Sequence, residues 1–273
     1  ARNPMLLANL GYDLQLMSGG RFMLGLGSQI RPHIEKRFSA TWSRPAARMH
    51  EMVRAIRAIW ACWQDGKPLD FRGEFYTHTL MTPVFTPGSN PHGLPPIYLA
   101  GVGPRMTEVA GEVADGLLVH PFNTARFVAN EVLPALDRGL AASGRTRADC
   151  DVSAQFIVAT GLDREERERN LALARGQVAF YASTPAYRPV LDCHGWGDLQ
   201  PRLNALSKEG KWAEMGALLS DELVNEVVIH GSPEEVGERL RARAGDWCGR
   251  ASPVLYAGDL EIRERLVRAI KRS

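Results

Sequence analysis

Short, continuously apolar runs that are each followed by helical sequence constrain this chain most strongly. Five such runs predict strands, at Arg21 to Gly27, Pro96 to Ala100, Gly116 to His120, Val152 to Thr160 and Pro253 to Ala257. Because these runs are apolar throughout and do not alternate with polar residues, both of their faces should be buried, as in a parallel sheet covered by helices. The repeated order of strand and helix therefore predicts an α/β fold with right-handed crossovers.

The clearest helical pattern lies between the first two predicted strands. Its apolar residues are spaced three or four apart and form one stripe, at Met49, Met52, Val53, Ile56, Ile59, Trp60 and Trp63. Further helices are predicted after Pro104, after Asn123, after Asp163, from Pro233 to Ala244 and from Leu260 to Ile270.

Two long inserts interrupt the strand-and-helix order, at about residues 64–95 and 175–230. The first contains "FRGEFYTHTL", which predicts a hairpin because Gly73 divides two short segments rich in aromatic residues. Long inserts at one end of an α/β sheet typically build a lid or a substrate wall. We expect residues 1–273 to form a single domain.

Charge and cysteine content exclude several classes of protein. The 33 Lys and Arg residues nearly balance the 31 Asp and Glu residues along the chain, which argues against a nucleic-acid or membrane-surface partner. The four cysteines are far apart, without a Cys-x-x-Cys pair or a His cluster, so no metal site is predicted. No apolar run approaches the roughly 18 residues that a membrane helix needs. We expect a cytoplasmic protein.

The stretch "YLAGVGPRMTEVAGEVADG", residues 98–116, joins a predicted strand to a helix through a Gly-x-Gly turn. A dinucleotide-binding fingerprint needs a third small residue, where this chain has Met106, and an acid about 20 residues on. The acids Glu108, Glu112 and Asp115 are too close for that role, so a nicotinamide dehydrogenase is disfavoured. Two readings remain: an anion-binding turn in which the glycines expose backbone N–H groups at a helix N-terminus, or a tight turn without a ligand.

Three blocks, "ARNPMLLANLGYDLQLMSGGRFMLGLGS", "PPIYLAGVGPRMTEVAGEVADGLLVHPF" and "GSPEEVGERL", resemble the luciferase-like monooxygenase superfamily. The resemblance is to its actinobacterial branch of enzymes that depend on coenzyme F420. It implies a TIM (β/α)8 barrel of the bacterial-luciferase type, in which the five predicted strands are strands four to eight and the opening block supplies the third helix. Strands one to three would lie upstream of Ala1, and we expect the functional protein to be longer than this chain.

The same resemblance, with the rule that barrel sites lie at the carboxyl ends of strands, implies where a cofactor binds. The expected contacts are Gly27, Ser28, Gln29, Gly101, Val102, Gly103, Pro104, Arg105, His120, Pro121 and Phe122. His120 is also the candidate catalytic residue within this chain, although it could equally be structural, and the principal catalytic residues are expected upstream. The inserts offer His194, Trp196, Tyr76 and His78, which either touch substrate or pack a loop.

Four functions stay open at this point. The resemblance favours hydride transfer between C5 of F420 and a small organic substrate, with a homodimer as the expected assembly. The first alternative is a monooxygenase that uses FMN. The second is a flavin-binding or interaction protein of the same fold without turnover. A phosphate-binding barrel aldolase or isomerase ranks last, because the strand ends carry no Lys and no carboxylate pair.

Overall fold

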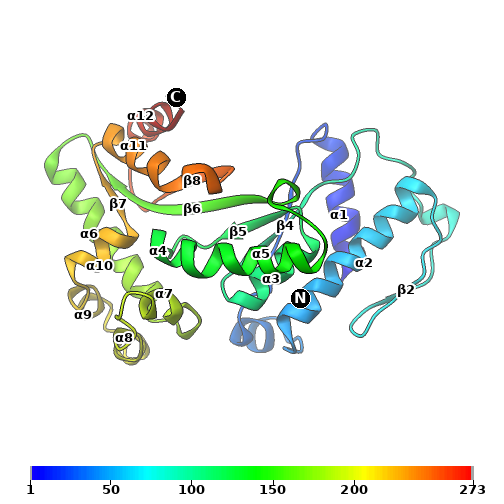
Figure 1. The fold of residues 1–273 in the computed structure, drawn as a ribbon, viewed down its shortest axis with the longest axis horizontal. Coiled ribbons are helices and arrows are strands. Elements are labelled where there is room, and N and C mark those ends of the chain that lie inside the picture. The colour runs from blue at the N-terminus through cyan, green and yellow to red at the C-terminus, as the bar shows by residue number, and fades with distance from the viewer. Residues whose placement is uncertain (1, 272–273) are drawn as a thin grey trace. The chain divides into compact units, whose positions relative to one another are not determined.

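Parallel strands are the framework of the structure, a computed structural model that describes residues 2–271 (Figure 1). The chain divides into two compact units. The first unit comprises residues 1–118 and 135–151, and the second comprises residues 119–134 and 152–273. That the whole chain is a single domain stays a prediction.

Three strands form the sheet of the first unit. β1 (Leu24–Leu26) pairs in parallel with β4 (Ile97–Gly101), and β5 (Gly116–Val119) follows β4 in the sheet order. These strands confirm the first three predicted apolar runs. Because strands joined by helical crossovers run in the same direction, their carboxyl ends lie at one edge of the sheet.

The helix α2 (Pro45–Asp65) confirms the predicted apolar stripe, whose seven side chains are all buried. It packs on α1 (Pro4–Met17), where the indole Nε1 of Trp60 donates a hydrogen bond to the carbonyl oxygen of Ala8 at 3.0 Å. Burial of each large apolar side chain stabilises the fold by roughly 1.5–3 kcal/mol. This stripe therefore holds α2 in place beside α1.

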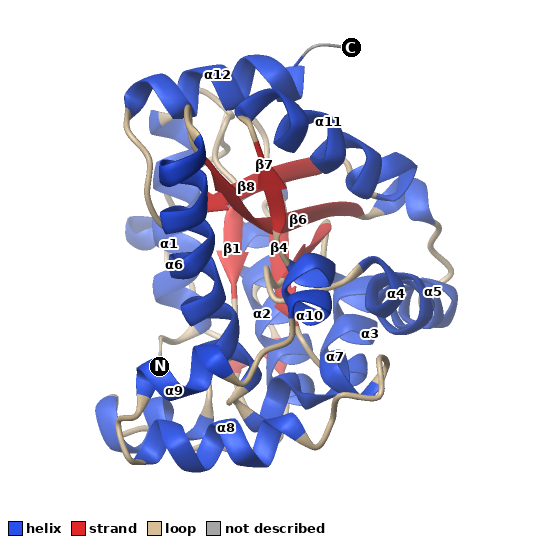
Figure 2. Cartoon of the chain, turned by 90° about the vertical axis from the view of Figure 1, so that its left-hand side faces the viewer, coloured by secondary structure: helices blue, strands red, loops and turns tan. Residues whose placement is uncertain are grey.

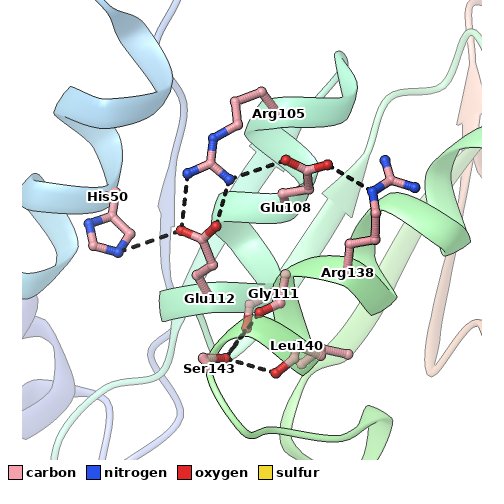
Figure 3. A network of polar contacts seen from close by, with 9 residues as sticks. His50, Arg105, Glu108, Gly111, Glu112, Arg138, Leu140 and Ser143 are labelled. Carbon is pink, nitrogen blue, oxygen red and sulfur yellow. Dashed lines mark hydrogen bonds and ion pairs between the residues drawn. The ribbon is translucent and has the colours of Figure 1, made fainter.

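Close helix packing in the first unit depends on glycine. Helix α3 (Pro104–Val113) lies against α5 (Leu133–Ala142), and a Cβ at Gly111 would lie 2.5 Å from the carbonyl oxygen of Leu136. A Cβ at Gly139 would overlap the carbonyl oxygen of Glu108. The hydroxyl of Ser143 donates to the carbonyl oxygen of Gly111 at 3.3 Å at the end of this contact (Figure 3).

The predicted hairpin in the first insert is confirmed. β2 (Phe71–Arg72) pairs antiparallel with β3 (Thr77–His78). Glu51 of α2 holds the turn, because its carboxylate accepts hydrogen bonds from the backbone N–H groups of Phe75 and Tyr76 at 2.7 Å each. The hairpin is thus tied to the main helix of its unit.

β6 (Asp151–Thr160) is the central strand of the second unit. It pairs in parallel with β7 (Ile229–Gly231) and with β8 (Arg250–Leu255). β8 begins three residues before the predicted strand at 253–257. The carboxyl ends of these three strands also share one edge.

β7 was missed, so the sequence-based count of five parallel strands was one too few for residues 2–271. Its apolar run, Val227 to Ile229, begins in the last residue of helix α10 (Asp221–Val227). A short apolar run of this kind does not distinguish a helix end from a strand.

Helices account for the rest of the second unit. α6 (Arg164–Ala182), α11 (Pro233–Ala244) and α12 (Leu260–Lys271) confirm three predicted helices, and α4 (Ala125–Phe127) begins the one expected after Asn123. The second insert is itself helical, with α7 (Arg188–Asp192), α8 (Leu199–Lys208), α9 (Trp212–Ala217) and α10. Figure 2 shows α8 and α9 beside the end of α6.

Substitution of Gly139 by alanine tests the glycine contact between α3 and α5. We expect Gly139→Ala to lower the free energy of unfolding by about 1–3 kcal/mol, because the methyl group must displace the α3 backbone. The matched control is Gly176→Ala within α6, where nothing lies within 4 Å of an added Cβ and the better helix former should raise stability by about 0.5–1 kcal/mol. Urea denaturation measures both, and equal stability of Gly139→Ala and the wild type would refute the close contact.

Candidate active site

The carboxyl ends of β1 and β4 lie side by side in the first unit. Gly27 directly follows β1, and a Cβ at this position would lie 3.5 Å from the Cβ of Ala100 in β4. Ser28 and Gln29 come next, and Gln29 has a φ of 60°. A left-handed φ is uncommon outside glycine and clusters at functional sites. The structure therefore brings the first predicted site segment next to the strand that leads into the second.

The Gly-x-Gly turn after β4 uses its two glycines differently. A Cβ at Gly101 would lie 2.9 Å from Oγ1 of Thr107 and 3.0 Å from Cδ1 of Leu117, so packing within the protein excludes a side chain there. Nothing lies within 4 Å of a Cβ at Gly103. Gly103 is the N-cap of α3, and no side chain caps this helix end.

The first turn of α3 is consequently open to a ligand. Pro104 stands at the first helical position and has no N–H group, and no acidic side chain occupies the first turn. The backbone N–H groups of Arg105 and Met106 belong to the set that a helix leaves without intrahelical acceptors. Together with the partial positive charge of the helix end, they suit an anion such as a phosphate.

The side chain of Arg105 is engaged along α3 and away from its first residues. Its guanidinium donates to Glu112 at 2.6 Å and to Glu108 at 3.1 Å, and Arg138 of α5 donates to Glu108 at 2.9 Å (Figure 3). The hydrogen bond from Arg138, followed by the one from Arg105, holds the pKa of Glu108 below its usual range. The backbone N–H of Arg105 remains at the open helix end, whereas its charge is already balanced by carboxylates.

His120 lies in the second unit at the carboxyl end of β5, among aromatic rings. Its Nδ1 accepts a hydrogen bond from the backbone N–H of Phe122 at 3.1 Å, and its Nε2 lies 3.0 Å from the hydroxyl oxygen of Tyr187. The ring stacks on Tyr187 at 4.4 Å and meets the ring of Tyr181 edge-on at 4.8 Å. Burial lowers the pKa of His120 to about 4, so the imidazole is neutral at pH 7. Both of its ring nitrogens have protein partners.

Pro121 and Phe122, the next two residues after His120, are buried. The ring of Phe122 packs 6.2 Å from that of Tyr181 and 6.1 Å from that of Tyr187. The ring of Phe122 thus packs near the two tyrosine rings that contact His120, and the role of Pro121 and Phe122 in cofactor binding stays a prediction.

Tyr181 and Tyr187 join His120 in this candidate site, and the sequence did not predict either of them. Tyr187 comes from the second insert and is separated from His120 by 67 residues. The insert had been identified as a wall, but no spacing in the sequence links a tyrosine within it to one strand end.

The turn after His120 is fixed by hydrogen bonds within the second unit. The side-chain amide of Asn123 donates to the carbonyl oxygens of His120 at 2.7 Å and of Gln155 at 3.0 Å. Thr124, the N-cap of α4, accepts from the backbone N–H of Phe127 at 3.1 Å. The His120 ring is therefore carried by an ordered turn.

His194 and Trp196 of the second insert pack against this turn. Their rings stack at 4.5 Å, and Nε2 of His194 lies 2.8 Å from Oγ1 of Thr124. Tyr76 and His78 lie in the hairpin of the first unit, where Arg48 lies over the Tyr76 ring at 5.8 Å. These contacts give His194, Trp196 and Tyr76 a packing role, and substrate contact by any of them or by His78 stays a prediction.

A charged groove of about 660 Å³ lies in the first unit at the amino end of β5, away from the strand ends discussed above. Within it, Arg57 pairs with Asp115 at 2.9 Å, and Arg145 donates to the carbonyl oxygens of Gly111 and Ala114. These cations close helix and strand ends, so the groove is chiefly structural.

Two kinds of feature are absent from residues 2–271. This part of the chain contains no group of three or more His, Cys, Asp or Glu side chains placed to hold a metal ion. None of its helices combines the length and apolar character needed to cross a membrane.

Known proteins resemble this chain over most of its length. The luciferase-like monooxygenase family matches residues 1–247. An uncharacterized protein of Mycobacterium tuberculosis is 52% identical over 261 residues, which make up 96% of this chain and 77% of that protein. The 5,10-methylenetetrahydromethanopterin reductase of Archaeoglobus fulgidus is 32% identical over 245 residues, 87% of this chain and 68% of the reductase.

Solved structures share the fold at low sequence identity. The coenzyme F420-dependent tetrahydromethanopterin reductase from Methanopyrus kandleri has a TM-score of 0.75 at 19% identity, covering 98% of this chain and 78% of that one. An F420-dependent secondary alcohol dehydrogenase in complex with an F420-acetone adduct has a TM-score of 0.70 at 16% identity, covering 98% and 76%. The oxygenating constituent of 3,6-diketocamphane monooxygenase from the CAM plasmid of Pseudomonas putida, in complex with FMN, has a TM-score of 0.60 at 16% identity, covering 92% and 69%.

The parallel strands with helical crossovers, the polar turns at their carboxyl ends and the family match over residues 1–247 lead to one assignment. The chain belongs to the luciferase-like monooxygenase family and has its TIM-barrel type of α/β fold.

Proposed function

We propose that this protein is a coenzyme F420-dependent oxidoreductase that transfers a hydride between C5 of the deazaflavin and a small organic substrate. The observation that carries the proposal is the uncapped N-terminus of α3, which directly follows the carboxyl end of β4. The two F420-dependent structural neighbours support this cofactor class.

The residues after β4 fit the phosphate of such a cofactor. Open space above Gly103 leaves room for a ligand atom, and the N–H groups of the first α3 turn supply donors without a competing side chain. We assign the phosphate contact to Gly101, Val102, Gly103 and Pro104, together with the backbone of Arg105. When bound, the deazaflavin would supply a carbon centre that gives or takes a hydride, and the protein would supply position and a dry site.

We also assign cofactor contacts to the other two predicted segments, which follow β1 and β5. Gly27, Ser28 and Gln29 lie at the same sheet edge of the first unit. Because Gly27 has no side chain, a flat ring could approach its backbone closely. His120, Pro121 and Phe122 directly follow β5. The helical second insert is assigned the role of a substrate wall. The homodimer and the cytoplasmic location remain predictions.

An FMN-dependent monooxygenase is the second candidate function. The structure of the diketocamphane monooxygenase constituent with FMN favours it, because that protein shares the fold. Both cofactors carry a phosphate, so the α3 N-terminus alone does not separate them. A protein of this fold that binds flavin without turnover is the third candidate.

Equilibrium titration with each cofactor distinguishes the candidates. We expect F420 to bind with a change in its absorbance and fluorescence, and FMN at the same concentrations to leave the protein without bound flavin. Binding of FMN and not F420 would replace the proposal by the monooxygenase alternative. Binding of F420 without hydride transfer to any of a panel of carbonyl and enoyl compounds would favour the inactive binding protein.

Two substitutions at Gly103 test the phosphate contact. Its φ of −92° and ψ of 157° suit any N-cap residue. We expect Gly103→Asp to raise the Kd for F420 at least tenfold, because a capping carboxylate occupies the α3 N–H groups and repels the phosphate. The isosteric control Gly103→Asn caps without the charge and should weaken binding less. Helix stability should change by only about a few tenths of a kcal/mol, and an unchanged Kd in Gly103→Asp would place the phosphate elsewhere.

A further inference from the structure

The hydrogen bond between His120 and Tyr187 has a direction that the surrounding turn determines. Nδ1 of His120 faces the backbone N–H of Phe122 at 3.1 Å. Because an N–H group can only donate, Nδ1 must be the unprotonated acceptor nitrogen. Neutral imidazole carries one proton, and in this ring it therefore resides on Nε2.

The proton on Nε2 determines whether the Tyr187 hydroxyl accepts or donates in its hydrogen bond with His120. Nε2 lies 3.0 Å from the hydroxyl oxygen, so His120 donates and Tyr187 accepts. A tyrosine hydroxyl that accepts from one partner still has its own hydrogen to donate. The hydroxyl hydrogen of Tyr187 is therefore directed away from His120.

We propose that Tyr187 is a substrate-binding residue whose hydroxyl donates a hydrogen bond to the oxygen of a neutral carbonyl or alcohol substrate, with His120 as the positioning residue. This inference rests on the proposed function, since it names the substrate class of that hydride transfer. It differs from the sequence-based assignment of catalysis to His120, whose nitrogens are both engaged by the protein.

The surroundings of Tyr187 favour a neutral substrate. The cluster of His120, Phe122, Tyr181 and Tyr187 presents ring faces and edges at the end of β5. A mostly aromatic surface that offers hydroxyl donors matches a ketone or a secondary alcohol better than a phosphate or a carboxylate.

The ionisation of the cluster agrees with this role. Burial, followed by the proximity of Tyr181, raises the pKa of Tyr187 above its ordinary value. The hydroxyl thus keeps its proton at neutral pH and stays a donor. Burial also keeps His120 neutral down to about pH 4, which preserves the direction of the hydrogen bond across the physiological range.

Nitrogen-15 NMR of histidine-labelled protein tests the hydrogen-bond direction without any cofactor. We expect His120 to titrate with a pKa of about 4 and to be the Nε2–H form above it. In Tyr187→Phe the Nε2–H signal should shift and exchange with water at least tenfold faster. Tyr181→Phe, which removes a hydroxyl from the same cluster, should leave that signal in place. The inference would be overturned if His120 carried its proton on Nδ1, or if the Nε2–H signal were the same in Tyr187→Phe as in the wild type.

A double-mutant cycle tests the substrate contact. With reduced F420 and the ketones cyclohexanone and acetophenone as probes, we expect Tyr187→Phe to lower kcat/KM about 10- to 100-fold and to leave the Kd for F420 within twofold. His120→Leu should cause a similar loss, and the double variant should lose no more than either one, because His120 acts through Tyr187. His120→Gln, whose amide can still donate, should recover part of the loss.

The outcomes separate this inference from the proposed function. Wild-type protein that binds F420 but reduces neither ketone, or Tyr187→Phe that keeps kcat/KM within twofold, would overturn the role of Tyr187 while the cofactor assignment stands. If the loss of kcat/KM in the double variant equals the product of the two single losses, the two residues act independently, and the positioning role of His120 is refuted. Wild-type protein that binds no F420 would defeat the proposed function itself, and the substrate role of Tyr187 with it.

Discussion

The parallel pairing of strands is the constraint on which the rest of the structure depends. In the first unit, β1 pairs with β4, and in the second unit, β6 pairs with β7 and β8. Parallel strands need crossover connections, so each strand end is followed by a turn and then by the N-terminus of a helix. Backbone donors and polar turns consequently follow the carboxyl ends of the strands, and the segments assigned to the cofactor follow β1, β4 and β5.

Packing away from the site keeps these turns in position. Gly111 and Gly139 let α3 and α5 approach closely, and Glu108 joins the two helices by accepting from Arg105 and Arg138. The same ion pairs draw the charge of Arg105 along the helix, which leaves backbone N–H groups as the donors at the α3 N-terminus. In the second unit, hydrogen bonds from Asn123 hold the turn that carries His120.

Local patterns in the sequence predicted much of this fold. Apolar spacing located α2, and the Pro233 to Ala244 prediction coincides with α11, which begins with a capping box of Ser232 and Glu235 in the structure. β7 was not predictable, because three residues directly after a helix carry no periodic signal. The strand ends could be named as site segments from topology, but the pairing of His120 with Tyr187 depends on how the second insert folds back, which no local pattern encodes.

Amide hydrogen exchange of the wild-type protein tests the cofactor assignment most directly. The account predicts that added F420 slows exchange at the backbone N–H groups of Gly103, Arg105 and Met106, which lie at the open end of α3. The charged groove at the amino end of β5 should show no such change. Protection confined to that groove, or bound F420 that leaves the α3 N-terminus exchanging as before, would contradict the central claim.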